Sequence, residues 1–244
     1  MAPEQETHEI EFRSDVAVEL VRSSADDSDV LFAARVSTRG EQSLQDVDAN
    51  ASRSSGLINY LMRDRHGSPF EHNSMTFYVS APIFVFREFM RHRIASYNEE
   101  SGRYRELRPV FYVPSGDRKL VQRGKPGAYE FVDGTPEQLE LVQRETEAVC
   151  RQAYAAYQRM LTAGVAREVA RIVLPVTIFS TMYVTMNARS LMNFLSLRTK
   201  RDDSHFVSFP QREIEMVAEK METVWAELMP LTHAAFEKNG RVAP

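Results

Sequence analysis

The stretch SMTFYVSAPIFVFREFMRHRIASYNEESGRYRE, residues 74–106, contains the strongest local signals for secondary structure in the chain. Its first part places Met75, Phe77 and Val79 on one face and polar or small residues between them, which is the alternation of a half-buried β-strand. Pro82 follows and suits the first position of a helix, so the next residues, IFVFREFMRHRIA, are predicted to be helical. A polar, arginine-rich connector ends the stretch. A strand and a helix in direct succession favour a fold that mixes both.

The rest of the chain continues this mixture without a regular βαβ repeat, which favours an α+β fold over a doubly wound sheet. Strands are expected at residues 8–12, 16–21, 110–113 and 177–186, with a helix as the alternative for the last. Helices are expected at residues 31–37, 56–65, 136–163, 166–174, 187–198 and 210–228. Residues 38–55 and 114–134 are expected to be surface loops, the second being the longest irregular segment.

Composition limits the class of protein. A chain of 244 residues is long enough to bury roughly 70–75% of its unfolded surface, and no linker divides it, so residues 1–244 are expected to form a single domain. A net charge of −4 does not suggest a nucleic-acid or membrane partner. A lone cysteine, Cys150, excludes an internal disulfide, and the polar start of the chain does not resemble a signal peptide. We therefore expect a cytoplasmic protein.

The connector at residues 91–106 concentrates charge. Between Arg87 and Arg108 six arginines are interleaved with four glutamates, whereas a nucleic-acid stripe would be uniformly basic. Arg91 and Arg93 are expected on different faces of a helix end, where planar guanidinium donors suit a phosphate or pyrophosphate. An exposed, salt-bridged turn is the alternative.

A second candidate is HGSPFEH, residues 66–72, which places two histidines, a hydroxyl and a carboxylate close together. As a metal site it is weak, because the HExxH spacing is absent and no acidic triad or cysteine accompanies it. The segment is also compatible with a capped turn that leads into the strand after it.

Two further segments carry isolated polar residues. Arg171 lies in the apolar flank ARIVLP, where it needs either an anionic partner or a route to solvent. Asn187 and Arg198 are eleven residues apart, so on a helix they share one face at a separation of about 16 Å. An ordinary helix with Asn187 as its cap and Arg198 at its C-terminal dipole explains the second pair equally well.

Together these four segments resemble the flavin-dependent thymidylate synthase family. The resemblance rests on Arg91-His92-Arg93 followed by seven residues and Ser101, extended to Arg103, and on HGSPFEH, AREVARIVLP and VTMNARSLMNFLSLR. It spans residues 66–198 and implies a single flavin-dependent thymidylate synthase domain over residues 1–244. The implied fold is an antiparallel β-sheet flanked by long helices, of the thymidylate synthase-complementing type.

The resemblance also implies an activity and its residues. The family methylates dUMP to dTMP with 5,10-methylenetetrahydrofolate as carbon donor, NADPH as reductant and FAD as the hydride carrier. FAD binding would involve Ser68, Arg91, His92, Arg93, Glu99, Asn187, Ala188, Arg189 and Asn193. Substrate binding would involve His66, Glu88, Phe89, Met90, Arg91, Glu99, Glu100, Ser101, Gly102, Arg103, Arg171 and Arg198. Among them Arg198 matches the arginine that is proposed to stabilise ionised N3 of the uracil, and no metal is implied.

The lone thiol bears on this mechanism. Other thymidylate synthases activate the uracil by adding a cysteine thiolate to its C6 atom. Here Cys150 lies in the middle of an expected helix, far in sequence from every motif, and is predicted to be a small buried residue. Electrostatic activation by guanidinium groups is then the remaining route, with Ser101 assigned to nucleotide binding rather than to covalent attack.

The chain lacks the GxGxxG turn of a Rossmann fold, so FAD would be held by side chains, above all arginines. The family does this at the subunit interfaces of a homotetramer, and we hypothesise that residues 91–103 and 187–198 of different chains share one site. The connection after Arg198 looks slightly longer than usual in the family, which places Lys200 and Arg201 beside it.

Two other functions were weighed. A metal-dependent nucleotide phosphohydrolase would use donors of the two acidic or histidine-containing segments: His66, Glu71, His72, Asp202 and Asp203. A nucleic-acid-binding module would use the arginine cluster, which the net charge and the interleaved glutamates disfavour. A yellow, flavin-containing preparation would favour the synthase over both.

Overall fold

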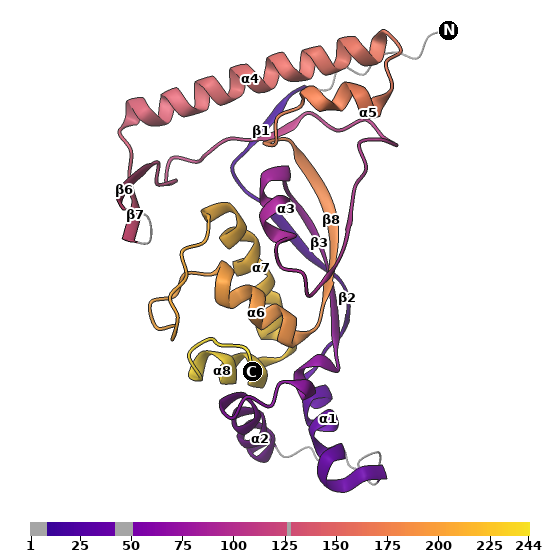
Figure 1. The fold of residues 1–244 in the computed structure, drawn as a ribbon, viewed down its shortest axis with the longest axis vertical. Helices are drawn as coiled ribbons and strands as arrows, with labels where there is room; N and C mark the ends of the chain where they lie inside the picture. Colours follow the sequence, from indigo (N-terminus) through magenta and orange to yellow (C-terminus); the bar gives the residue numbers. More distant parts are fainter. Residues whose placement is uncertain (1–8, 42–50, 126–127) are drawn as a thin grey trace. The chain divides into compact units, whose positions relative to one another are not determined.

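The computed structural model describes residues 9–41, 51–125 and 128–244 (Figure 1). The chain divides into two compact units. The first unit comprises residues 1–15, 80–87 and 99–181, and the second comprises residues 16–79, 88–98 and 182–244.

A four-stranded sheet has the order β2-β3-β8-β4. Its strands are β2 (Ala17–Ser24), β3 (Ser74–Pro82), β8 (Phe179–Met186) and β4 (Ser96–Glu99). Strands β3 and β8 run antiparallel, because Thr76 Oγ1 lies 2.9 Å from Thr185 Oγ1 while the backbone N–H of Ile83, just after β3, donates to the carbonyl of Ile178, just before β8, at 3.0 Å. The α+β prediction with an antiparallel sheet is confirmed.

The first unit contains two small sheets and the longest helix. Its elements are β1 (Glu11–Arg13), β5 (Val110–Tyr112), β6 (Val121–Lys125), β7 (Ala128–Val132), α4 (Pro136–Thr162), α5 (Arg167–Ala170) and the 3₁₀ turn η3 (Arg171–Val173). Strands β1 and β5 pair in parallel, and β6 and β7 form an antiparallel hairpin. Helix α4 packs against α5 and η3 over a core that includes Phe111, Cys150, Tyr157 and Ile178.

The second unit is mainly helical. Its helices are α1 (Asp27–Arg39), α2 (Ala51–Arg63), the 3₁₀ turn η2 (Ser68–Glu71), α6 (Ala188–Arg198), α7 (Arg212–Leu228) and α8 (Pro230–Lys238). Helix α7 packs against β2, α6 and α8, while α2 packs against α8. Trp225 is fully buried, and its ring lies edge-on to Phe236 with the centroids 5.7 Å apart.

Helix starts follow the capping rules. The backbone N–H of Gln138 donates to the side chain of Thr135 at 3.3 Å, and the backbone N–H of Thr135 donates to Gln138 Oε1 at 2.9 Å, so α4 begins with a capping box. Asp26 forms the same arrangement at α1.

Several predicted bounds are wrong. The predicted loop at residues 114–134 contains the β6–β7 hairpin, and the predicted polar connector contains β4. Helix α2 begins at residue 51 rather than 56, and α8 was not predicted. Residue 8 of the first predicted strand and residues 42–50 of the first predicted loop lie outside the described residues. Helix α3 (Ile83–Phe89) ends before the arginine cluster, and Pro82 is the last residue of β3 instead of the first of the helix.

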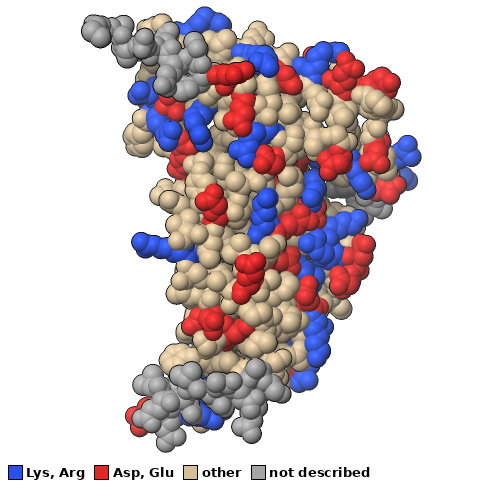
Figure 2. All heavy atoms as spheres, turned by 180° about the vertical axis from the view of Figure 1, so that it is seen from behind, with Lys and Arg blue, Asp and Glu red and all other residues tan. Residues whose placement is uncertain are grey.

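None of the helices in the described parts of the chain is long and apolar enough to cross a membrane. Figure 2 shows acidic and basic side chains intermixed over the visible face, and in that view they do not form a stripe of one sign. This distribution agrees with the interleaving of arginines and glutamates in the sequence.

Candidate functional site

The Arg-His-Arg segment lies in a tight turn after α3, not in a helix. The backbone N–H of His92 donates to the carbonyl of Phe89 at 2.9 Å, and that of Arg91 donates to Glu88 at 3.2 Å. The hydroxyl of Tyr97 reaches the carbonyl oxygens of both Phe89 and His92. These carbonyls stand at the helix end, where intrahelical partners are lacking, so Tyr97 stabilises the early end of α3.

Arg91 and Arg93 are both exposed in this turn. Among the residues that the structure describes, neither arginine forms an ion pair with a carboxylate. The prediction that they occupy different faces of a helix end is therefore wrong, because the helix has already ended. Two free guanidinium groups, two residues apart, remain a donor set that suits a phosphate or pyrophosphate.

His92 is fixed between the turn and α6. Its Nε2 atom lies 2.9 Å from Ser190 Oγ, and that hydroxyl donates its proton to the carbonyl of Ile94. Nε2 must therefore carry the proton and donate to Ser190. Burial lowers the pKa of His92, and the positive charge of Arg198 lowers it further, so the neutral imidazole is favoured at pH 7.

Helix α6 begins as the sequence predicts. Asn187 accepts a hydrogen bond from the backbone N–H of Ser190 at 2.9 Å, which confirms it as the N-cap. The next free N–H group, that of Ala188, donates to Asn73 Oδ1 at 2.7 Å. The side chain of Asn193 donates to the carbonyl of Arg189 within the helix, at 3.1 Å. The cap and its neighbours are thus rigidly held.

Arg189 lies against the segment that contains η2. Its Nη1 atom pairs with Glu71, and its Nε atom donates to the carbonyl of Pro244 at 2.6 Å. A Cβ atom on Gly67 would lie 2.5 Å from the guanidinium carbon of Arg189 and 2.7 Å from the backbone oxygen of Pro244, so a larger residue would displace one or both of these groups. Ser68 is exposed beside it, as is His66, whose ring stacks on Tyr60 at 5.7 Å.

Arg198, the last residue of α6, forms an ion pair with Glu88 near the end of α3. The Nη1 and Oε1 atoms are 2.8 Å apart, and the side chains are 22% and 21% exposed. Burial raises the pKa of Glu88, the charge of Arg198 opposes that rise, and nearby Glu213 adds to it. The orientation of the Arg198 guanidinium is therefore fixed by a carboxylate that ionises less readily than an ordinary glutamate.

Aromatic rings connect these two helix ends. Phe89 stacks on Phe194 with the centroids 4.4 Å apart, and the ring of His92 lies edge-on to Phe194 at 5.6 Å. Both phenylalanines are fully buried, whereas Met90 beside them is 38% exposed. The second unit thus gathers, around α6 and the turn after α3, the predicted residues His66, Ser68, Glu88, Phe89, Met90, Arg91, His92, Arg93, Asn187, Ala188, Arg189, Asn193 and Arg198.

The remaining predicted residues lie in the first unit: Glu99, Glu100, Ser101, Gly102, Arg103 and Arg171. Glu100 accepts a hydrogen bond from the hydroxyl of Thr181 at 3.2 Å and pairs with Arg105 at 2.8 Å. Arg103 pairs with Glu168 of α5 at 3.0 Å, although both side chains are about half exposed. Ser101 is half-buried, and the backbone N–H of Arg103 donates to its hydroxyl at 3.3 Å.

Gly102 is buried against Arg171. A Cβ atom there would lie 3.3 Å from Arg171 Cδ and 3.1 Å from Leu107 Cδ1, so the arginine stem packs on the glycine backbone. Burial raises the pKa of Glu99, while the positive charges of Arg171 and Arg87 oppose the rise. The sequence predicts that Arg171 needs either an anionic partner or a route to solvent. Its side chain is half-buried, so it reaches solvent in part, and its charge acts on the carboxylate of Glu99.

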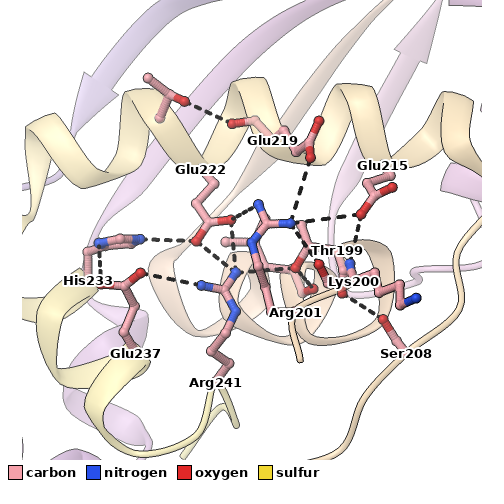
Figure 3. Close-up of polar contacts among 12 residues, drawn as sticks. Thr199, Lys200, Arg201, Ser208, Glu215, Glu219, Glu222, His233, Glu237 and Arg241 are labelled. Atoms are coloured by element: carbon pink, nitrogen blue, oxygen red, sulfur yellow. Dashed lines mark hydrogen bonds and ion pairs between the residues drawn. The ribbon is translucent and has the colours of Figure 1, made fainter. Parts of the chain in front are cut away.

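The geometry gives little support to a metal site built from the histidines and carboxylates that the phosphohydrolase hypothesis names. Within the described ranges, the group of metal-type donors that lie close enough together is Glu222, His233 and Glu237, far in sequence from the segment proposed (Figure 3). Glu71 is instead paired with Arg189. Arg241 already places a guanidinium nitrogen 2.7 Å from Glu222.

Comparison with known proteins settles the family. The family described as thymidylate synthase complementing protein matches residues 19–231. A flavin-dependent thymidylate synthase of Streptomyces coelicolor is 72% identical over 236 residues, covering 96% of each chain. The chain belongs to the flavin-dependent thymidylate synthase family. Members from Tropheryma whipplei and Thermotoga neapolitana are 63% and 43% identical, over 96% and 91% of this chain and 97% and 90% of theirs.

Solved structures agree with membership of the flavin-dependent thymidylate synthase family. The UMP/dUMP methylase PolB from Streptomyces cacaoi, bound with 5-Br dUMP, is 58% identical with a TM-score of 0.92. The same methylase bound with 5-Br UMP is 57% identical with a TM-score of 0.89. The matches cover 96% and 97% of this chain and 100% of each structure.

The donors of the second unit fit the flavin that gives the family its name. Arg91 and Arg93, which form no ion pair with a carboxylate in the described parts of the chain, could hold a pyrophosphate, and His92 is fixed beside them by its contact with Ser190. Gly67 keeps space open where a side chain would collide with Arg189. Among the described residues, Arg189 is the member of the expected cofactor-binding set that pairs with a carboxylate.

Cys150 matches the cysteine-free chemistry expected from the sequence. It is 1% exposed in the middle of α4, and its sulfur lies 3.3 Å from Thr177 Oγ1. Burial raises the pKa of its thiol, so the thiolate that a nucleophile requires is disfavoured. The prediction that this thiol is buried is confirmed.

Sequence reasoning missed the residues that hold the site residues in place. Asn73, Tyr97, Ser190 and Glu71 each bind a predicted site residue or its backbone. Ser190 lies within one of the recognised motifs and Asn73 directly follows another, so their position in the sequence could have marked them as neighbours of the site. Tyr97 gave no such signal, because its partners are carbonyl groups exposed by a helix end that the sequence placed elsewhere.

Proposed function

We propose that this chain is a flavin-dependent thymidylate synthase that methylates dUMP to dTMP. FAD is its cofactor, 5,10-methylenetetrahydrofolate the carbon donor and NADPH the reductant. The observation that carries the proposal is the half-buried Arg198, aimed by Glu88 and set beside the neutral His92, in a chain whose only thiol is buried. The names of relatives up to 72% identical support the same reaction.

Arg198 supplies the charge for activating the uracil. Thymine formation needs electron density at C5, and a guanidinium near N3 stabilises a pyrimidine in which that nitrogen has lost its proton. The arginine is always charged, and its planar donors match an amide edge. Glu88 holds the guanidinium in place before the substrate arrives, so little reorganisation is needed in the reaction.

Arg91 and Arg93 would bind the FAD pyrophosphate, and His92, Asn187, Ala188, Arg189, Asn193, Ser68 and Glu99 would complete its binding site. Bound FAD would supply hydride transfer between NADPH and the carbon that becomes the methyl group. His92 offers an Nε2–H donor to Ser190 and remains uncharged, so it keeps the turn rigid without adding a further cation.

Nucleotide binding would draw on His66, Glu88, Phe89, Met90, Glu100, Ser101, Gly102, Arg103 and Arg171. Arg103 and Arg171 provide cations for the 5′-phosphate, and the close packing of Arg171 on Gly102 fixes the start of its side chain. Ser101 has no base within its described contacts, which agrees with a binding role rather than a covalent one.

The proposal includes a homotetramer with active sites at its subunit interfaces and a location in the cytoplasm. The free thiol of Cys150 is compatible with a reducing compartment. Analytical ultracentrifugation of the FAD-loaded protein tests the assembly. A monomer that binds FAD tightly would contradict it.

Tritium release from [5-³H]dUMP tests the activity, with NADPH, FAD and methylenetetrahydrofolate supplied. We expect release, formation of dTMP and oxidation of NADPH in equal amounts, unaffected by a metal chelator. UMP belongs in the same assay, because the solved methylase relative was bound with both 5-Br UMP and 5-Br dUMP. A folded, FAD-loaded protein that releases no tritium refutes the proposal, and chelator-sensitive hydrolysis of nucleotides would establish the phosphohydrolase instead.

A further inference from the structure

A charged cluster lies beside Thr199, just after the C-terminal end of α6, and contains none of the residues assigned to substrate or cofactor. We call it the Arg241 cluster; it consists of Arg201, Glu222, His233, Glu237 and Arg241 (Figure 3). The side chain of Arg241 is 3% exposed, and its Nη2 atom lies 2.7 and 2.8 Å from the two carboxylate oxygens of Glu222. His233 Nε2 reaches the same carboxylate at 3.0 Å.

The acidic groups of the Arg241 cluster are neutralised by the guanidinium groups of Arg241 and Arg201. Arg241 Nη1 also lies 3.7 Å from Glu237, and Arg201 Nη2 lies 3.7 Å from Glu222. Burial alone would raise the pKa of Glu222, but the hydrogen bond from His233 and the charge of Arg241 outweigh it and lower that pKa. The carboxylate is therefore ionised and fully engaged by arginine, and a metal ion would have to displace Arg241.

Arg241 connects this cluster to the last turn of α6. Its Nη2 atom donates to Thr199 Oγ1 at 3.2 Å, and its own carbonyl shares the hydroxyl proton of Ser196 with the carbonyl of Met192, each 2.7 Å from Ser196 Oγ. Thr199 immediately follows Arg198 and in turn donates to the carbonyl of Leu195 at 2.8 Å. One residue thus holds α6 from both its side chain and its backbone.

The residues after Arg198 are held by Glu215 of helix α7 and by Ser208, which precedes that helix. The backbone N–H of Lys200 donates to Glu215 at 2.8 Å, and Ser208 donates to the carbonyl of Thr199 at 2.7 Å. The C-terminal turn of a helix otherwise lacks partners for its last carbonyls and frays. These contacts fix the point from which the Arg198 side chain emerges.

The backbone of Arg241 has an unusual conformation. Its φ angle is +57°, a left-handed value that favours glycine, and it follows Gly240 at +73°. The N–H groups of both residues close the end of α8, on the carbonyls of Phe236 and Glu237 at 2.9 and 3.0 Å. An arginine kept in a conformation that glycine adopts more easily indicates that its side chain is needed there.

We propose that Arg241 is a positioning residue for Arg198: by holding Thr199 and Ser196 it fixes the last turn of α6 and thereby aims the Arg198 guanidinium at the pyrimidine. This inference rests on the proposed function, in which Arg198 binds the nucleotide. A displacement of about 1 Å can cost about 10²-fold in rate, so a distant contact of this kind can matter for catalysis.

The alternative is that Arg241 only stabilises the packing of α7, α8 and α6. Both ideas predict a lower melting temperature when Arg241 is changed, so stability alone does not separate them. Binding of dUMP does, because a purely structural role would lower FAD content and dUMP affinity together. Coupling to Arg198 is the sharper criterion, since a residue that acts through Arg198 has nothing to add once Arg198 is gone.

The experiment compares wild type, Arg198→Gln, Arg241→Lys and the double variant, all FAD-loaded. The dissociation constant for labelled dUMP is measured by equilibrium dialysis, with FAD content and melting temperature recorded alongside. Lysine can still pair with Glu222, but it lacks the planar donors that bridge Glu222 and Thr199. Arg144→Lys is the matched control, because Arg144 is an exposed arginine of α4 that pairs with Glu145.

We expect each single variant to weaken dUMP binding about tenfold, which corresponds to about 1.4 kcal/mol. The double variant should bind dUMP no more weakly than the weaker single variant, and Arg144→Lys should match wild type. If the effects multiply in the double variant, or if FAD content falls in parallel with dUMP affinity, the positioning role is overturned. If wild type itself fails to bind dUMP, the proposed function fails and this inference fails with it.

A second pair of variants tests the same idea without altering the ion pair, in case Arg241→Lys does not fold. Thr199→Val removes the hydroxyl that Arg241 contacts, whereas Thr199→Ser keeps it. We expect the valine variant to raise KM for dUMP several-fold with normal FAD content, and the serine variant to restore it. Equal kinetics in the two variants would overturn the positioning role.

Discussion

The ion pair between Arg198 and Glu88 allows catalysis to be separated from stability by charge-matched substitutions. Arg198→Gln should bind FAD as wild type does but lower kcat for dTMP formation about 10²–10³-fold, the usual cost of losing one group that stabilises transition-state charge. The double variant Glu88→Gln/Arg198→Gln should be equally inactive, because it also lacks the guanidinium. Tritium release from labelled dUMP measures both.

Stability should behave differently. In Arg198→Gln, the one-fifth-exposed carboxylate of Glu88 loses a cation that lay 2.8 Å away. A hydrogen bond to a charged partner contributes about 1.5–3 kcal/mol, and partial exposure places this one near the lower limit, at about 1.5 kcal/mol. The double variant leaves two neutral amides that can bond to each other, so most of that free energy of unfolding should return. Denaturant unfolding followed by circular dichroism measures it.

The pH dependence follows from the direction of the Glu88 pKa. Burial raises it in the folded protein, so the folded state binds this proton more tightly than the unfolded state does, and the carboxyl disfavours folding as pH rises above about 4.3. Without Arg198 the pKa rises further. The difference in free energy of unfolding between wild type and Arg198→Gln should therefore be small near pH 4, grow with pH and then level off. The double variant lacks the Glu88 carboxyl, so it should not show the loss of stability with pH that Arg198→Gln shows.

Two outcomes would refute this reasoning. Turnover above a tenth of wild type in FAD-loaded Arg198→Gln would remove Arg198 from the reaction. A double variant as unstable as Arg198→Gln, with a gap that does not change with pH, would show that Glu88 is not the group left unpaired.

Three further predictions concern single positions. Cys150→Ala should keep near-wild-type turnover and lose about 1 kcal/mol of stability, since it removes a buried group of roughly methylene size. Asp27→Ala should lose about 3 kcal/mol in denaturant unfolding, because its carboxylate accepts from the backbone N–H groups of Leu231 and Thr232 at 2.8 and 2.9 Å and from the Thr232 hydroxyl at 2.6 Å. Gly67→Ala should lower FAD content, measured by absorbance, because its Cβ atom would collide with Arg189.

Matched controls exist for the last two. Asp64 forms an exposed ion pair with the adjacent Arg63, so Asp64→Ala should leave the free energy of unfolding nearly unchanged. A Cβ atom on Gly56 of α2 would meet nothing within 4 Å, so Gly56→Ala should keep its FAD and gain up to about 1 kcal/mol. A folded but inactive Cys150→Ala variant would revive thiol catalysis, and normal FAD content in Gly67→Ala would remove Arg189 from the cofactor site.

The parts of the fold that the sequence predicted are those with a local cause. Strand β3 follows from the alternation of Met75, Phe77 and Val79, all fully buried, and α4 follows from the reciprocal hydrogen bonds of Thr135 and Gln138. The cap at Asn187 belongs to the same class. Each signal involves residues within four positions of one another, so it survives without knowledge of the rest of the chain.

The elements that were missed depend on distant partners or on weak patterns. The side chains of β6 are all partly or fully exposed, so no buried face marks that strand, and its pairing with β7 is made by backbone hydrogen bonds, with Gly124 at a φ of +96°. Helix α8 begins at Pro230 directly after α7, a start signal hidden by the continuous helical pattern. Its N-terminal N–H groups are satisfied by Asp27, far away in sequence.

At the site, the sequence predicts which residues are present but not which of them are paired with one another. The sequence identified the arginines, but pairing sets what each can do: Arg91 and Arg93 lack carboxylate partners in the described parts of the chain, whereas Arg198 is bound to Glu88. Unpaired arginines present their full charge to an incoming phosphate or pyrophosphate, at the expense of fixed geometry. A paired arginine gives up part of its charge for direction, and the burial of Glu88, which raises the pKa of its carboxyl, works against that pairing.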